Sequence, residues 1–154
     1  MTDRKSHWES IYRDKSPLEV SWYQQEPALS LELIRRSGIA HDAPIIDVGG
    51  GASVLVDRLL AAGCTELSVL DISARSLDCA RQRLGTAAGR IDWIEADITA
   101  FSPSRTYALW HDRAVFHFLT DKADRARYVE GLHRALRPGG YVIIAAFAIG
   151  GPKQ

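Results

Sequence analysis

Apolar residues along this chain fall into two patterns, short continuous runs and stretches in which they recur every three or four positions. Continuous runs of this length predict buried strands, and the wider spacing predicts amphipathic helices. Strands and helices that alternate in this way form a mostly parallel sheet with helices on both faces, a three-layer α/β/α fold. The predicted strands lie at 45–48, 67–71, 91–97, 107–110 and 141–147, and the last is apolar enough to be buried on both faces.

Helices are predicted between these strands. One covers residues 54–60, and Ser73 is placed to cap a second, whose inward positions are Leu77, Ala80 and Leu84. The last helix is predicted to begin at Thr120 or Asp121 and to end at Pro138-Gly139-Gly140. Its apolar stripe is Ala126, Val129, Leu132 and Leu136, and its last turns carry Arg134 and Arg137.

We expect a single domain over residues 1–154, with an N-terminal helical cap at 1–38 and a core at 39–154. The cap is predicted to contain a short helix around Trp8 and Tyr12, an extended aromatic pair Trp22-Tyr23, and a second helix over 27–36. Its aromatic side chains either pack onto the core or form a lid over a ligand crevice at the carboxyl ends of the strands.

Composition limits the classes of partner. Lysine plus arginine and aspartate plus glutamate both number 19, so no net charge steers the protein toward nucleic acid or a membrane surface. The longest apolar stretch, 141–149, is far shorter than the roughly 20 residues of a membrane helix. The N-terminus is too polar for a signal peptide. With two cysteines, Cys64 and Cys79, that lack metal-site spacing, we expect reduced thiols in a soluble, cytoplasmic protein.

A glycine turn and four aspartates carry the candidate chemistry. The first strand leads into Gly49-Gly50-Gly51, where missing Cβ atoms let the backbone approach a ligand. Asp47, Asp71, Asp97 and Asp112 fall in or after four successive strands, so we expect them along one rim of the sheet. There Asp71 could accept hydrogen bonds from both hydroxyls of a ribose. Asp97 could bind an adenine edge, with Ile72 and Ile98 over the ring faces.

At these residues the sequence resembles the class I S-adenosylmethionine-dependent methyltransferases, with a Rossmann-like sheet. The likeness covers residues ~40–148 and rests on Asp47-Val48-Gly49-Gly50-Gly51, Asp71, Asp97-Ile98 and the turn 136–142. It implies S-adenosylmethionine as cofactor and methyl transfer to a small-molecule or protein acceptor. The cofactor-binding residues that we expect are Asp47, Gly49, Gly51, Asp71, Ile72, Asp97, Ile98, Asp112, Tyr12 and Trp22.

Two departures from the family pattern are visible. Ser53 stands at the last glycine position of the motif, where a small residue that can cap a helix is expected to do little harm. The family usually continues with two further strands, so we expect a sheet that lacks them, in a fragment or a shortened version. An apolar fifth strand at a sheet edge would pair readily with another chain, and residues 141–149 are therefore predicted to mediate a homodimer, to swap between chains or to lower solubility.

The sequence names no catalytic base. Because the sulfonium already activates the methyl group, the protein mainly has to align the acceptor and exclude water. Candidates near the reacting centre are His111, Asp112, Arg113 and His117, all placed after the fourth predicted strand. Alternatively, Asp112 and Arg113 form a structural ion pair and His117 is simply packed. No histidine pair has a metal-type partner set, so no metal is expected.

Two other functions compete with methyl transfer. A nicotinamide-dependent oxidoreductase also uses a glycine turn and a ribose acid, but its third glycine would fall at Val54. A non-catalytic protein of the same fold, retaining the cofactor, is the other alternative. A nucleic-acid methyltransferase is disfavoured because the chain has no basic stripe.

Overall fold

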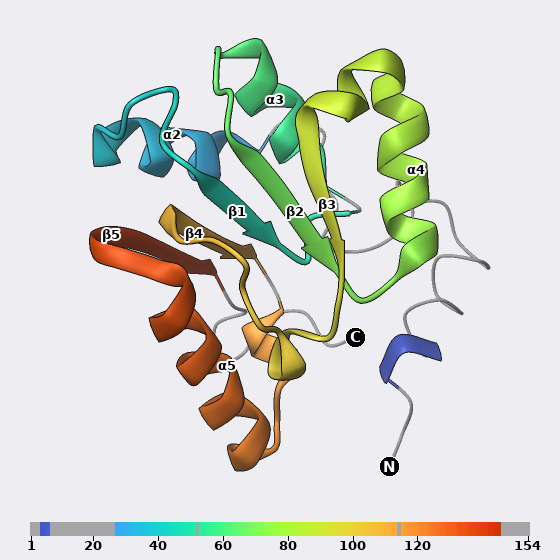
Figure 1. Ribbon diagram of the computed structural model, residues 1–154, viewed down its shortest axis with the longest axis vertical. Coiled ribbons are helices and arrows are strands. Elements are labelled where there is room, and N and C mark those ends of the chain that lie inside the picture. Colours follow the sequence, from blue (N-terminus) through green and yellow to red (C-terminus); the bar gives the residue numbers. More distant parts are fainter. Residues whose placement is uncertain (1–3, 7–26, 52, 114, 146–154) are drawn as a thin grey trace.

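The computed structural model describes residues 4–6, 27–51, 53–113 and 115–145 (Figure 1). Five strands form one parallel sheet in the order β3-β2-β1-β4-β5. β1 therefore lies at the centre. The chain adds β2 and β3 on one side of β1 and then crosses to the other side, where it forms β4 and β5. The strands are β1 (Ile45–Val48), β2 (Leu67–Asp71), β3 (Ile91–Glu95), β4 (Tyr107–Arg113) and β5 (Leu136–Ala145).

Helices cover both faces of the sheet, which confirms the predicted three-layer architecture (Figure 1). One core cluster joins α2, α3 and α4 to the first face through Ile34, Leu59 and Leu77. A second cluster joins α5 to the opposite face through Trp110 and Tyr128. The helices are α2 (Ala28–Ser37), α3 (Leu55–Ala61), α4 (Ala74–Leu84) and α5 (Lys122–Ala135), with short 3-10 turns η2 (Gly85–Arg90), η3 (Ile98–Ala100) and η4 (Phe116–Phe118).

Side-chain caps fix the starts of two helices where the sequence predicted them. The Ser73 hydroxyl accepts a hydrogen bond from the Ser76 amide at 3.1 Å, and α4 begins directly after it. Asp121, one of the two predicted caps, accepts from the Ala123 amide at 2.8 Å and starts α5. Each cap satisfies a backbone amide that has no acceptor within the first turn of the helix.

The inward face predicted for α5 was correct at Leu132 and Leu136, which pack partly buried against the core cluster, and wrong at Ala126 and Val129. Its buried residues are Tyr128, Gly131 and Ala135, whereas Ala126 and Val129 are exposed. The tyrosine fits this inward position because its hydroxyl finds polar partners inside the core. The spacing of aliphatic residues therefore identified Leu132 and Leu136 on the packed face but missed Tyr128.

The predicted end of α5 was also wrong. The helix stops at Ala135, and Arg137 and the Pro-Gly-Gly sequence belong to β5 instead. The pairing of β4 with β5 shifts register between Tyr107 and Leu109, and Gly139 there has a φ of 77°. A proline without an N–H and a glycine with positive φ thus interrupt the ladder rather than end the helix.

β5 is not buried on both faces, contrary to the prediction. It is the edge strand of the described sheet, and Tyr141, Val142 and Ile144 are each more than 40% exposed. β4 has the continuous burial expected of a strand between two neighbours, and it extends three residues beyond the predicted end, to Arg113. His111, Asp112 and Arg113 are thus strand residues, not residues that follow the strand.

Several predictions lie outside the described residues. They concern the first cap helix, the Trp22-Tyr23 pair and residues 146–149. Of the predicted cap, the structure describes a helical turn at Arg4–Ser6 and α2, which covers the predicted 27–36 within about one residue. It stays a prediction that residues 1–154 form one domain with a cap at 1–38 and a core at 39–154.

Candidate functional site

The four aspartates line the carboxyl edge of the sheet, as predicted. Asp71 ends β2, Asp97 follows β3 by two residues, and Asp47 and Asp112 lie near the ends of β1 and β4. Their side chains divide between the two faces, because Asp47 pairs in register with His111 and Asp112 with Val48. Asp47 therefore faces the layer of α2 and α3, and Asp112 faces α5.

The glycine turn between β1 and α3 is packed so closely that side chains are excluded. The Gly49 amide donates to the Leu70 carbonyl at 2.7 Å, and Gly49 adopts a φ of 73°. A Cβ on Gly50 would lie 2.3 Å from Asp47 Oδ2, and one on Gly51 would lie 2.0 Å from Ser76 Oγ. The turn is thus a backbone surface beside two carboxylates.

Asp71 is held as an acceptor inside this turn. Its Oδ2 accepts from the Gly51 amide at 3.1 Å and the Ser76 hydroxyl at 3.3 Å, and its Oδ1 accepts from the Ser73 amide at 2.9 Å. Burial raises the pKa of Asp71 to about 6, although these hydrogen bonds lower it. A carboxylate offers about four acceptor sites, so the hydrogen bonds from the described residues leave one site on Oδ1 without a donor.

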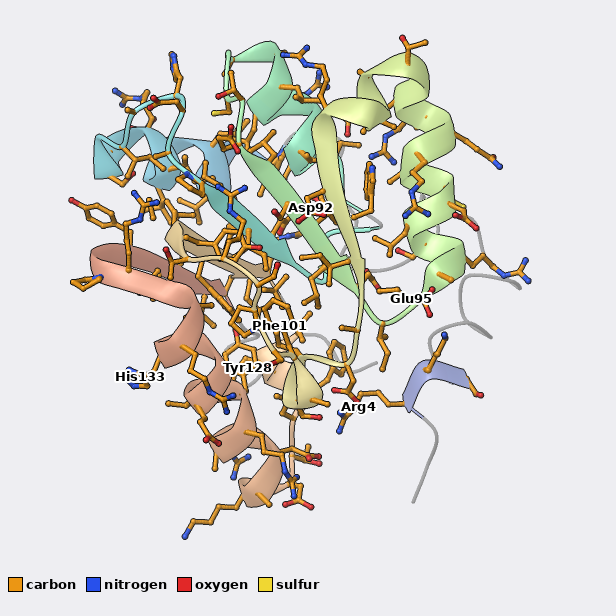
Figure 2. The ribbon with its side chains drawn as sticks, in the orientation of Figure 1. Arg4, Asp92, Glu95, Phe101, Tyr128 and His133 are labelled. Atoms are coloured by element: carbon orange, nitrogen blue, oxygen red, sulfur yellow. The ribbon has the colours of Figure 1, made fainter. Side chains whose placement is uncertain are left out.

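Asp97 is engaged by the N-terminal segment. Arg4 Nη1 donates to both of its oxygens, at 2.9 and 2.8 Å, and the other guanidinium nitrogen donates to Asp124 of α5 at 2.8 Å. Figure 2 shows Arg4 reaching toward the turn that follows β3. Asp97 Oδ1 also accepts from the Thr99 amide and hydroxyl, whereas Oδ2 has only the arginine contact among these bonds.

Asp47 forms a buried chain with two other side chains. Its Oδ1 lies 2.8 Å from His111 Nδ1, and His111 Nε2 lies 2.8 Å from the hydroxyl of Ser30 on α2. All three residues are buried. The second oxygen, Oδ2, is buried and has no hydrogen-bond partner among the residues that the structure describes. A buried carboxylate oxygen in this state is unfavourable unless a donor reaches it.

Asp112 organises the chain after β4. Its carboxylate accepts from the amides of Val115 and Phe116, at 2.7 and 3.0 Å, and from the Tyr128 hydroxyl at 2.6 Å. Tyr128 in turn accepts from Trp110 Nε1 at 2.9 Å and lies between α5 and the sheet (Figure 2). Burial raises the pKa of Asp112, against these hydrogen bonds. The observed contacts make it a support for the loop.

The remaining candidates occupy different surroundings. Ile98 is buried in the core cluster on the α5 face, and Ile72 is half-buried. Arg113 ends β4; burial lowers its pKa, and the charge of Asp47 raises it, so Asp47 is its electrostatic neighbour. His117 is exposed in η4 rather than packed, with its ring edge-on to Phe118 at 5.3 Å.

The described part of the chain shows neither a metal-ion cluster nor a membrane-spanning helix. It contains no group of three or more histidine, cysteine, aspartate or glutamate side chains placed to hold a metal ion. Within the same residues, no helix combines the length and apolar character needed to cross a bilayer.

Sequence reasoning missed the supporting residues Ser30, Ser76, Tyr128 and Arg4. Ser76 carries a usable signal, because it lies three residues after the predicted helix cap, in the first turn beside Asp71. The other three find their partners only through tertiary packing: Ser30 bonds His111 across 81 residues of sequence, Tyr128 bonds Asp112 across 16, and Arg4 bonds Asp97 across 93.

A parallel sheet with a glycine turn and buried carboxylates at its carboxyl edge defines a Rossmann-like, nucleoside-binding domain. A family model described as a methyltransferase domain matches residues 45–140, more than half of the chain. The chain therefore belongs to the methyltransferase-domain family, which confirms the resemblance to class I S-adenosylmethionine-dependent methyltransferases.

Individual relatives agree with this assignment. Nodulation protein S of Rhizobium tropici is 29% identical over 133 residues, which are 86% of this chain and 52% of that protein. Trans-aconitate 2-methyltransferase of Azoarcus sp. strain BH72 is 32% identical over 117 residues, 73% of this chain and 42% of that protein. The chain thus spans about half the length of these curated relatives.

Solved structures share the fold. The N-methyltransferase NodS from Bradyrhizobium japonicum WM9, in complex with S-adenosyl-L-homocysteine, gives a TM-score of 0.71 at 22% identity, over 92% of this chain and 72% of that one. The glycopeptide N-methyltransferase MtfA, complexed with S-adenosyl-L-methionine, gives 0.66 at 22% identity, over 76% and 52%. These neighbours confirm the predicted Rossmann-like fold.

Proposed function

We propose that this domain binds S-adenosylmethionine across the carboxyl edge of the sheet and transfers its methyl group to a small-molecule or protein side-chain acceptor by in-line displacement. The observation that carries the proposal is Asp71. A buried carboxylate at the end of β2, an interior strand, is fixed by the Gly51 and Ser73 amides and has one acceptor site without a donor among the described residues. The family match supports the same function.

The residues present fit the cofactor. Positions 50 and 51 require glycine, because a Cβ there would collide with Asp47 Oδ2 and Ser76 Oγ, so the turn brings its backbone directly beside the carboxylates proposed to bind the cofactor. The unpartnered Asp47 Oδ2 is an acceptor for a cationic donor, and the cofactor's amino-acid end carries an ammonium group. On this proposal Gly49 and Gly51 shape the turn, and Asp47 binds the amino-acid end.

Asp71 and Asp97 would bind the adenosine part. The open site on Asp71 Oδ1 suits one ribose hydroxyl, and a second could bind where the Ser76 hydroxyl now donates, at 3.3 Å. Asp97 Oδ2 accepts from Arg4, and its second acceptor site would take a hydrogen bond from the adenine amino group. Ile72 and Ile98 are proposed to contact the ring, and Tyr12 and Trp22, outside the described residues, to cover the site.

The cofactor supplies an electrophilic methyl group on a sulfonium sulfur. The protein has to position the acceptor and exclude water, and both tasks fall to the residues at the end of β4. Asp112 holds the backbone of Val115 and Phe116, which fixes the start of the loop beside the site. We propose this positioning role for Asp112, and we propose that Arg113 binds an anionic group of the acceptor.

Isothermal titration calorimetry with S-adenosylhomocysteine and NAD tests the cofactor directly. We expect the nucleoside thioether to bind and NAD to give no heat of binding; the reverse would support the oxidoreductase alternative. A labelled-methyl screen on cell extract then tests turnover. Cofactor binding without methyl transfer to any acceptor would favour the non-catalytic alternative.

We also propose a homodimer through β5. The strand lies at the edge of the described sheet, with Val142 and Ile144 exposed on one of its faces and Tyr141 exposed on the other. Light scattering at high concentration should show a dimer that Val142→Lys converts to a monomer. A wild-type monomer under the same conditions would contradict this. The cytoplasmic location, with both cysteines free, stays a proposal.

A further inference from the structure

The buried chain Asp47–His111–Ser30 connects the glycine turn to helix α2. In the neutral imidazole, Nδ1–H donates to Asp47 Oδ1 and Nε2 accepts from the Ser30 hydroxyl, each over 2.8 Å. Both ring nitrogens are thus occupied, and the ring is fixed between a central strand and the first turn of a helix. Ser30 and His111 are almost fully shielded from solvent, with exposed fractions of 7% and 3%.

This chain determines where the other oxygen of Asp47 points. A carboxylate is planar, so a bond to Oδ1 along a fixed direction leaves Oδ2 little freedom to turn. Oδ2 lies 2.3 Å from where a Cβ of Gly50 would be, directly against the glycine turn, and has no partner among the described residues. Without the imidazole, the carboxylate could rotate toward other donors and the oxygen would no longer face the turn.

We infer that Ser30 and His111 are positioning residues: they hold Asp47 so that its free oxygen receives the ammonium group at the amino-acid end of the cofactor. This inference rests on the proposed function and adds two residues to it, neither of which touches the cofactor. Their effect should therefore be confined to ligands that carry the amino-acid end. A purely structural role would weaken every ligand of the site equally, or none.

Two ligands separate these cases. S-Adenosylhomocysteine has the adenosine and the amino-acid end, whereas 5′-methylthioadenosine has the adenosine and thioether but no ammonium or carboxylate. Calorimetry with both is carried out on wild type, Ser30→Ala and His111→Gln. The matched control is Ser37→Ala, which removes a hydroxyl from the same helix where it bonds only the Ile34 carbonyl and the Ile39 amide.

We expect Ser30→Ala to weaken S-adenosylhomocysteine about three- to tenfold, the effect of one hydrogen bond, with 5′-methylthioadenosine unchanged within about twofold. His111→Gln should show a larger loss with the same selectivity, and Ser37→Ala should resemble wild type. Equal weakening of both ligands in Ser30→Ala, or no weakening of either, would overturn the inference while leaving the proposed cofactor standing. A wild-type protein that binds neither ligand would instead overturn the proposed function, and this inference with it.

Discussion

Replacing Tyr128 by phenylalanine removes one oxygen from the centre of the network that supports the end of β4. That oxygen donates to Asp112 at 2.6 Å and accepts from Trp110 Nε1 at 2.9 Å. A hydrogen bond to a charged group contributes about 1.5–3 kcal/mol, and a buried donor left without an acceptor costs about 1–3 kcal/mol. Because neither site opens to water, the two effects together should destabilise the fold by about 4 kcal/mol.

Thermal unfolding followed by circular dichroism measures this loss. For a domain of this size, 1 kcal/mol changes Tm by about 2–4 °C, so Tyr128→Phe should lower Tm by on the order of 10 °C. Tyr141→Phe is the matched control, since it deletes the same oxygen from an exposed side chain of β5 and should change stability by less than about 0.5 kcal/mol. Equal Tm values for the two variants would refute the claim that the network stabilises the fold.

Further predictions concern the turn that holds Asp71. Asp71→Ala should weaken S-adenosylhomocysteine by about 1–3 kcal/mol in calorimetry, and Asp92→Ala, exposed on β3, should not; equal affinities would show that the ribose is not held there. With a pKa of about 6, Asp71 should lose affinity for the ligand as pH falls below 6, and a flat profile from pH 7 to 5 would count against its role. Its contribution to stability should run the other way: it is present in full below the unfolded pKa near 3.8 and is lost as pH rises through about 6, a gain of about 1 kcal/mol over Asp71→Ala on going from pH 7 to 5. Gly51→Ala should abolish binding because its Cβ would lie 2.0 Å from Ser76 Oγ, and adding Ser76→Ala should restore part of it; an unaffected single variant would show that the turn can yield.

The sheet was predictable because its signals are local. Each interior strand is a short, mostly apolar run, and polar caps at Ser73 and Asp121 mark the starts of α4 and α5. The position of the acidic residues along one edge of the sheet then follows from the parallel arrangement, because that arrangement places the carboxyl end of every strand on the same edge.

Where prediction was wrong, the deciding contacts lie far apart in the sequence. The inward face of α5 depends on the hydrogen bonds of Tyr128 with Trp110 and Asp112. The spacing of aliphatic residues along the helix does not predict these polar contacts. The apolar composition of β5 predicted burial of both faces, whereas its exposure follows from its position at the sheet edge. Likewise, the contact of Arg4 with Asp97 joins two segments with no local pattern in common.

The central claim is that two carboxylates at the edge of this sheet bind an adenosine. A crystal structure with S-adenosylhomocysteine tests it most directly. We expect a ribose hydroxyl within hydrogen-bond distance of Asp71 and the adenine amino group beside Asp97. Density for the ligand elsewhere on the protein, with both carboxylates still bonded only to their present partners, would contradict it.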